Sequence, residues 1–434
     1  MNNEIGGGMS GPSFVRLRLS MMMFLQFFVW GAWYVSQTGF MNDRGMGALI
    51  AWAYTVGPLA AIVSPFFLGL VADRFFPTQR VLGVMHLLGG AAMLAAPMVA
   101  RPYVEGNPKF LEPYVLILLL HMLCYMPTLG LTTSLAFHNL PNRERDFPLI
   151  RVWGTIGWIA GNIAVSMLPG KDQSAEQFSM TGAAAIALGL FAFTLPHTPP
   201  PAAGKKASVR EILGLDSLAL LCRPSYAVFI ACSFLLCIPL AGYYAFARNY
   251  VEATGAVVNE SAVFTMSFGQ MSEIFFMLVM PLCFARLGVK WMLAVGMLAW
   301  VVRYGLFAGA WGGEEAGAEH VKWMVLAGVI LHGICYDFFF VTGMVYVDRA
   351  AGREIRSQAQ GFLVLVTQGL GMLIGAQAFG RLVGHYTAQA PDGADVLDWR
   401  SIWMIPCVFA GAIMLVFIAL FREKRSDSVE LQGH

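Results

Sequence analysis

The stretch Glu144–Gly161, ERDFPLIRVWGTIGWIAG, sets a group of charged residues directly against a long apolar run and places Arg151 inside that run. If the run crosses a bilayer, an arginine in it costs about 2.5 to 3.5 kcal/mol on insertion scales, so it normally faces a partner or a water-filled cavity. On a helix, Arg151, Thr155 and Trp158 lie at positions i, i+4 and i+7, which share one face. A cation, a hydroxyl group and a large ring on one stripe indicate a polar small-molecule site. The alternative is that Arg151 reaches the lipid headgroups and Trp158 packs against a neighbouring helix.

The composition of the whole chain agrees with a membrane location. Of the 434 residues, 57% are hydrophobic and only 12% are charged, whereas a soluble domain carries about 25% charged residues. We therefore expect an integral membrane protein. The net charge of +2 gives no indication of nucleic-acid binding. The seven cysteines are scattered, which argues against a disulfide framework or a zinc site.

Apolar runs long enough to span a bilayer recur along the sequence, since a spanning helix needs about 20 mostly apolar residues. A segment rich in Pro, Ala and Lys, 196–224, separates two halves with six runs each. This pattern predicts an N-terminal bundle over 1–195, a cytoplasmic linker over 196–224 and a C-terminal bundle over 225–434. The predicted spans are 18–40, 47–72, 81–100, 113–138, 148–168, 177–195, 225–247, 261–284, 290–310, 321–347, 357–384 and 399–421.

The distribution of positive charge predicts the orientation. Arg16 and Arg18 precede the first run and no small-residue cleavage site follows it, so we expect this helix to be retained. Most of the 28 lysine and arginine residues lie in the termini and the even-numbered loops. Because positively charged loops stay inside, both termini are predicted to be cytoplasmic.

Two cytoplasmic loops occupy equivalent places in the two halves. The loop after the second run reads GLVADRFFPTQR and contains Asp73, Arg74 and Arg80, and the loop after the eighth run reads FARLGVK. This recurrence resembles the loop motif of the major facilitator superfamily, in which charged residues form a latch that breaks as the halves rock. The resemblance implies a gating role for Asp73, Arg74 and Arg80.

Polar residues gather in two runs of the C-terminal half. Gln270 and Glu273 are three residues apart and share a helix face. His332 and Tyr336 are one turn apart, and Asp337 is turned about 100° from Tyr336. Such residues within membrane spans indicate a functional site.

The two carboxyl groups admit two interpretations. Removal from water disfavours the charged form of Glu273 and Asp337, and a nearby arginine favours it. A carboxyl group poised between these effects loads a proton on one side and releases it on the other. The alternative is structural: one carboxylate neutralises Arg303 of the ninth run in a buried pair. The sequence leaves open which one would do so.

Other features of the runs carry less chemistry. Gln26 and Trp30 in FLQFFVWGAWY are one turn apart and could reach a cavity. The small-residue runs GTIGWIAG and QGLGMLIG predict helix packing surfaces. No phosphate-binding loop of the G-x-x-x-x-G-K-[ST] type, H-E-x-x-H, G-x-S-x-G or metal-ligand spacing is present. We therefore expect neither an ATP-driven pump nor an enzyme, and no cofactor or metal.

Several of these stretches together resemble one known family, the bacterial nucleoside–proton symporters of the major facilitator superfamily. They are FLQFFVWGAW, YMPTLGL, DFPLIRVWGTIGW, LGLDSLALL, QMSEIFFMLVMPLCFARLGVK and GICYDFFFVTG, in order from the first to the last span. The resemblance implies an all-α membrane protein with twelve transmembrane helices in two six-helix bundles, a central site and alternating access. It implies Asp337 as the leading proton-coupling carboxylate, with Glu273 second. The substrate contacts that it implies are Arg151, Thr155, Trp158, Gln270, Glu273, His332 and Tyr336.

The sequence departs from the family pattern in the stretch IPLAGYYAFARNY. The family offers a Gln and an Asn there, at positions that correspond to Ala241 and Tyr244. His332 also stands where the family often has Tyr, and Trp158 where it has Phe. Since a site that leaves polar groups of a substrate unpaired rejects that substrate, these changes bear on selectivity. We expect Tyr244 to wall the substrate ring.

These observations favour proton-coupled import of nucleosides or a related polar, ring-bearing metabolite. One alternative keeps the fold and moves a sugar or glycoside, or exports a substrate by antiport. A second is a membrane-embedded enzyme or a sensor. We expect a monomer in the bacterial inner membrane, with a small-molecule substrate, protons and lipid as its partners and no nucleic acid.

Overall fold

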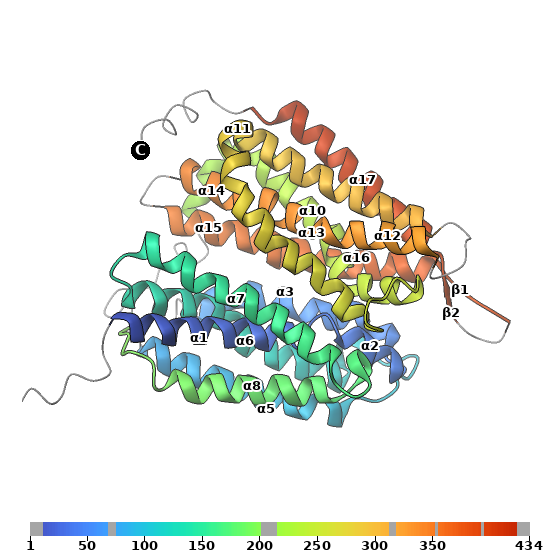
Figure 1. Cartoon of the computed structure of the whole chain (residues 1–434), viewed down its shortest axis with the longest axis horizontal. Coiled ribbons are helices and arrows are strands. Elements are labelled where there is room, and N and C mark those ends of the chain that lie inside the picture. Colours follow the sequence, from blue (N-terminus) through green and yellow to red (C-terminus); the bar gives the residue numbers. More distant parts are fainter. Residues whose placement is uncertain are drawn as a thin grey trace, which may run out of the picture. The chain divides into compact units, whose positions relative to one another are not determined.

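The computed structural model describes residues 12–67, 75–200, 215–311, 318–351, 355–391 and 395–422, and almost every element in these ranges is a helix (Figure 1). Nine helices among them are long and apolar enough to cross a membrane. One of the nine, α11 (Ala262–Ala310), is 49 residues long and consists of two spans that meet at Gly288. Two further helices, α7 (Arg143–Ser166) with its charged first turn and the 17-residue α8 (Glu176–Ala192), complete the twelve spans.

The chain divides into two compact units. One comprises Met1–Phe40 and Val63–Ala207, and the other comprises Met41–Ile62 and Ser208–His434. The first part of the second predicted span therefore groups with the C-terminal half. The division into 1–195, 196–224 and 225–434 stays a prediction.

The first unit is built on helix pairs. Helix α1 (Pro12–Gly31) packs along α7, and α5 (Thr78–Val99) packs between α6 (Pro113–Asn139) and α8. The predicted run 18–40 is not one regular helix, because a turn at 32–36 separates α1 from α2 (Gln37–Asp43). In this turn the Ser36 hydroxyl group lies 3.2 Å from the Trp33 carbonyl and 2.6 Å from Gln177 Oε1. Such side-chain bonds offer the backbone an alternative to the regular helix. The short elements of this unit are η3 (Lys109–Leu111) and η4 (Lys171–Gln173).

The close approach of α1 and α7 depends on glycine. A Cβ atom on Gly31 would lie 2.5 Å from the Trp158 carbonyl oxygen, and one on Gly161 would lie 2.8 Å from the Ala32 nitrogen. One on Gly157 would overlap the Phe24 carbonyl oxygen. The prediction that GTIGWIAG is a packing surface is confirmed.

The second unit contains the remaining helices and a small hairpin. Helix α10 (Pro224–Ala253) packs against α16 (Met372–His385) and α17 (Trp399–Leu420), and α17 packs along α11. Gly375 lets α16 approach α10, because a Cβ atom there would lie 2.7 Å from the Ile238 carbonyl oxygen. The prediction for QGLGMLIG is thereby confirmed. The other elements are η1 (Gly47–Leu49), α3 (Ile50–Phe67), η5 (Leu215–Cys222), α12 (Glu319–Ile330), α13 (His332–Cys335), η6 (Tyr336–Val341), α14 (Thr342–Ala350), α15 (Arg356–Val364), η7 (Leu365–Gly371), β1 (Thr387–Gln389) and β2 (Asp395–Leu397).

Three local irregularities shape this unit. Gly288 has φ 66°, which glycine adopts without steric cost, and it reverses the chain between the two spans of α11. Segments η6 and η7 are π-helical interruptions of otherwise α-helical spans. Such bulges occur often at functional sites. Segment η6 begins with Tyr336 and Asp337, two of the predicted site residues.

Candidate functional site

A buried polar chain crosses the second unit from Glu273 to Arg303. Glu273 Oε1 lies 3.0 Å from His332 Nε2, and Arg303 Nη1 lies 3.1 Å from His332 Nδ1. Arg303 is fully buried, and the His332 side chain is 3% exposed. Nε and Nη2 of Arg303 have no hydrogen-bond partner. The guanidinium group therefore reaches a carboxylate through the imidazole ring and not by the direct pairing that the sequence suggested.

Tyr243 supports both members of this chain. The Arg303 guanidinium carbon lies 3.3 Å from the centroid of the Tyr243 ring, and the His332 ring stacks on it at 5.4 Å with an angle of 20°. A cation over an aromatic face is stabilised by the ring quadrupole. Sequence reasoning singled out Tyr244 and missed Tyr243. The doublet was visible, but only packing shows which tyrosine faces α11.

Two predicted aromatic residues flank His332. The Tyr244 ring lies 6.3 Å from the imidazole at 84°, and the Tyr336 ring lies 6.3 Å from it at 33°. Both residues are partly buried. Ala241 is 2% exposed and faces Gly375 of α16. Of the two helix positions that depart from the family, Tyr244 is therefore the one beside the polar chain.

Two more predicted residues of this unit are deeply buried. Asp337 is 0% exposed, and neither of its carboxyl oxygens has a hydrogen-bond partner. Gln270 is 5% exposed, and its Oε1 has none. A buried polar atom without a partner is costly, and in functional proteins it often marks a site.

In the first unit, the predicted stripe lies on α7 and faces α1. The Arg151 guanidinium carbon lies 4.1 Å from the centroid of the Phe27 ring, and Gly154 leaves room for it. Thr155 and Trp158 are partly buried on the same helix. Arg151 is thus placed among side chains of α1, although its charge is not fully removed from solvent.

An aromatic cluster surrounds Trp30 of α1. Its ring lies 5.2 Å from Trp158, 5.5 Å from Tyr125 and 5.6 Å from Tyr34. The indole Nε1 atoms of Trp30 and Trp158 are buried without a hydrogen-bond partner. The cluster joins α1, α6 and α7 at one level.

A hydrogen-bond network around Gln26 supports this cluster from below in the sequence. Gln26 Nε2 donates to Thr128 Oγ1 at 2.7 Å, and His86 Nε2 lies 2.8 Å from Gln26 Oε1. The Tyr125 hydroxyl group donates to the Gln26 carbonyl at 2.7 Å. Because the Thr128 hydroxyl donates to the Tyr125 carbonyl, it accepts from Gln26, which fixes the amide orientation. Sequence reasoning missed His86, whose signal was an isolated histidine in an apolar run.

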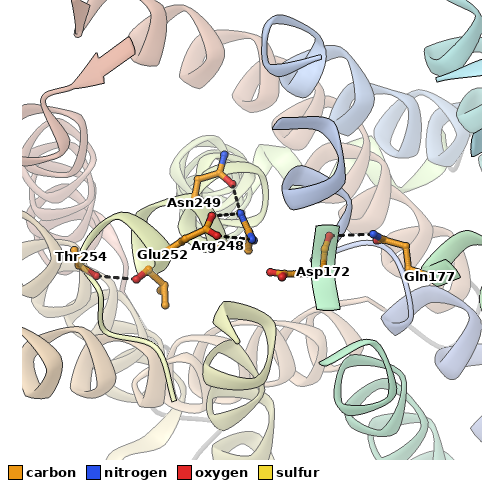
Figure 2. A network of polar contacts seen from close by, with 7 residues as sticks. Asp172, Gln177, Arg248, Asn249, Glu252 and Thr254 are labelled. Atoms are coloured by element: carbon orange, nitrogen blue, oxygen red, sulfur yellow. Dashed lines mark hydrogen bonds and ion pairs between the residues drawn. The ribbon is translucent and has the colours of Figure 1, made fainter. Parts of the chain in front are cut away.

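Two further groups of charged or polar residues lie outside these clusters. Figure 2 shows the buried Arg248 of α10 in a bidentate pair with Glu252, with one bond of 3.0 Å. It also shows Gln177, whose amide nitrogen lies 3.0 Å from the Asp172 carbonyl oxygen. Of the predicted gating residues, Arg80 is exposed near the start of α5, and Asp73 and Arg74 lie outside the described residues.

Twelve helical spans with buried charged residues in their interior define the class of protein. Charged groups within spans mark substrate and ion pathways. A soluble or purely structural helical protein has no use for such an arrangement. The chain is a membrane transport protein with the twelve-helix fold of the major facilitator superfamily.

Comparison with known proteins identifies the family. The model of the family described as "Nucleoside H+ symporter" matches residues 14–426. The putative nucleoside transporter YegT of Escherichia coli (strain K12) is 38% identical over 419 residues, which cover 94% of each chain. The nucleoside permease NupG of the same organism is 31% identical, with 94% of this chain and 96% of that one covered. A crystal structure of nucleoside transporter NupG superposes with a TM-score of 0.80 at 30% identity, over 94% of this chain and 100% of that chain. The chain belongs to the nucleoside H+ symporter family.

Proposed function

We propose that this protein imports nucleosides, or a closely related polar metabolite with a ring, and drives the import with protons. The buried chain Glu273–His332–Arg303 carries the proposal, because it places a carboxylate, an imidazole and a guanidinium group inside membrane spans. The similarity to nucleoside transporters over 94% of the chain supports the substrate class.

The substrate contacts of the proposal come from both units. In the first unit they are Arg151, Thr155 and Trp158, which share one face of α7. In the second unit Glu273 and Gln270 would bind hydroxyl and amide groups of the substrate, and Tyr244 and Tyr336 would wall its ring. The last four residues belong to α10, α11 and η6.

The two carboxyl groups differ in a way that assigns their roles. Glu273 has a hydrogen-bond donor in His332, whereas the oxygens of fully buried Asp337 have no partner. An ionised carboxylate without partners is costly in such a place, so Asp337 is the group that carries a proton in this state. Asp337 is therefore the leading coupling residue of the proposal and Glu273 the second.

The orientation and assembly of the proposal follow from charge and from the family. Both termini lie in the cytoplasm, because most lysine and arginine residues fall in the termini and even-numbered loops. The membrane is the bacterial inner membrane, the protein acts as a monomer, and Asp73, Arg74 and Arg80 belong to a cytoplasmic gating loop.

The experiment that tests this function is uptake of labelled uridine and adenosine into cells that express the chain, with and without a protonophore. We expect uptake above the vector control that the protonophore abolishes. Asp337→Asn should lose this accumulation, and Asp395→Asn, the same substitution at an exposed position, should keep it. Absence of uptake by protein shown to reach the membrane would refute the nucleoside assignment.

One specific observation favours a shifted substrate range. Tyr244 lies beside His332 at a position where the family offers an amide, so a hydrogen-bonding partner for a base is replaced by a ring. Competition of an unlabelled panel of nucleosides, bases, sugars and glycosides against uptake would define the range. Inhibition by a sugar and not by any nucleoside would favour the alternative substrate class.

A further inference from the structure

The hydrogen bonds of His332 determine which ring nitrogen carries its proton. An arginine side chain has donors and no acceptor, so His332 Nδ1 must accept the bond from Arg303 Nη1 at 3.1 Å. The ring proton then lies on Nε2, where it donates to Glu273 Oε1 at 3.0 Å. The same two bonds leave no place for a second proton. A charged imidazole would direct an N–H group at a guanidinium group that is fully buried.

The packing around the ring leaves it little freedom. His332 stacks on Tyr243 at 5.4 Å, and a Cβ atom on Gly269 would lie 3.0 Å from the Cβ of His332. The backbone at the next residue is also fixed, since Gly333 donates to the Ser272 hydroxyl group at 3.1 Å. Ser272 immediately precedes Glu273, so the two helices that carry the bond are joined on both sides of it.

We propose that His332 is a neutral hydrogen-bond bridge that positions the Glu273 carboxylate for substrate and connects it to the charge of Arg303. In this role His332 neither carries the transported proton nor needs to touch the substrate. It replaces the direct Arg303–carboxylate pair, and it leaves one Glu273 oxygen to face other groups. The inference rests on the proposed function only for its transport measurement.

Three substitutions separate the two halves of the bridge from simple packing. His332→Gln places an amide donor near the position of Nε2 and keeps the bond to Glu273. His332→Asn places an amide oxygen near the position of Nδ1 and keeps the bond to Arg303. His332→Phe keeps a ring to stack on Tyr243 and loses both bonds.

Hydrogen bonds to charged groups are worth tenfold or more in an equilibrium constant. We therefore expect His332→Phe and His332→Asn to raise the KM for uptake by roughly tenfold or more. We expect His332→Gln to retain a KM within a few-fold of the unsubstituted protein. Since all three keep Asp337, the protonophore should still abolish the uptake that remains.

A thermal-stability cycle tests the bridge without any transport. The Tm values of Glu273→Gln, His332→Phe and the double variant in detergent should be non-additive, because either single substitution removes the same connection. A matched cycle of Glu273→Gln with Tyr386→Phe, a distant tyrosine beyond the end of α16, should be additive. Additive effects in the first cycle, or a KM for His332→Phe equal to that of the unsubstituted protein, would overturn the inference. Absence of nucleoside uptake by the unsubstituted protein would refute the proposed function and leave the cycle as the test of the bridge.

Discussion

Neutralising each of the two carboxyl groups in turn should separate stability from coupling. Two hydrogen bonds of 3.1 and 3.0 Å and the imidazole between them separate the Arg303 and Glu273 charges by about 8 Å, a distance at which an effective dielectric constant of about 20 gives an attraction of about 2 kcal/mol. Glu273→Gln keeps an acceptor for His332 and removes only the charge. It should therefore lower the free energy of unfolding by about 2 kcal/mol and the Tm by a few degrees.

Asp337→Asn should behave differently although the residue is more deeply buried. Asp337 is 0% exposed, and its oxygens have no hydrogen bond to lose. The amide replaces a group that already lacks partners, so we expect an unchanged or raised Tm. Both variants should lose proton-driven accumulation.

The assay combines thermal unfolding of the purified protein in detergent with uptake of labelled uridine in cells. Asp395→Asn, on the exposed strand β2, serves as the control for the substitution itself. The reasoning fails if Asp337→Asn is destabilised as much as Glu273→Gln. It fails equally if Glu273→Gln unfolds at the temperature of the unsubstituted protein.

Two further predictions concern the first unit. Gly157→Ala should destabilise the protein by about 1 to 3 kcal/mol because the new Cβ would overlap the Phe24 carbonyl oxygen, and Gly361→Ala, where nothing lies within 4 Å, should be neutral or stabilising; equal Tm values would contradict this. Tyr125→Phe removes the 2.7 Å bond to the Gln26 carbonyl while keeping the ring, so we expect a loss of about 1 kcal/mol with little change in the KM for uptake, and a KM raised tenfold would instead place this hydroxyl group in the binding site.

Much of the fold followed from the sequence for simple physical reasons. Apolar runs of spanning length can satisfy their backbone polar groups in lipid only as helices, so composition and run length predict the spans. The glycines of GTIGWIAG predicted a close helix contact, and the structure places that contact between α1 and α7. A charged residue in such a run is costly wherever it lies, which is why Arg151, Glu273, Arg303 and Asp337 stood out before any contact was known.

The sequence could not determine which of these groups meet, because side-chain partners depend on how distant helices pack. Helical periodicity placed His332 and Tyr336 one turn apart, but it did not show that the span changes to π-helical geometry at Tyr336. Two interpretations of Arg303 remained, and both assumed a direct carboxylate partner. Only the tertiary structure placed an imidazole between Arg303 and Glu273, with Tyr243 beneath both rings of the contact. The sequence thus determined what kinds of groups the membrane interior holds, and packing decided which of them share a charge.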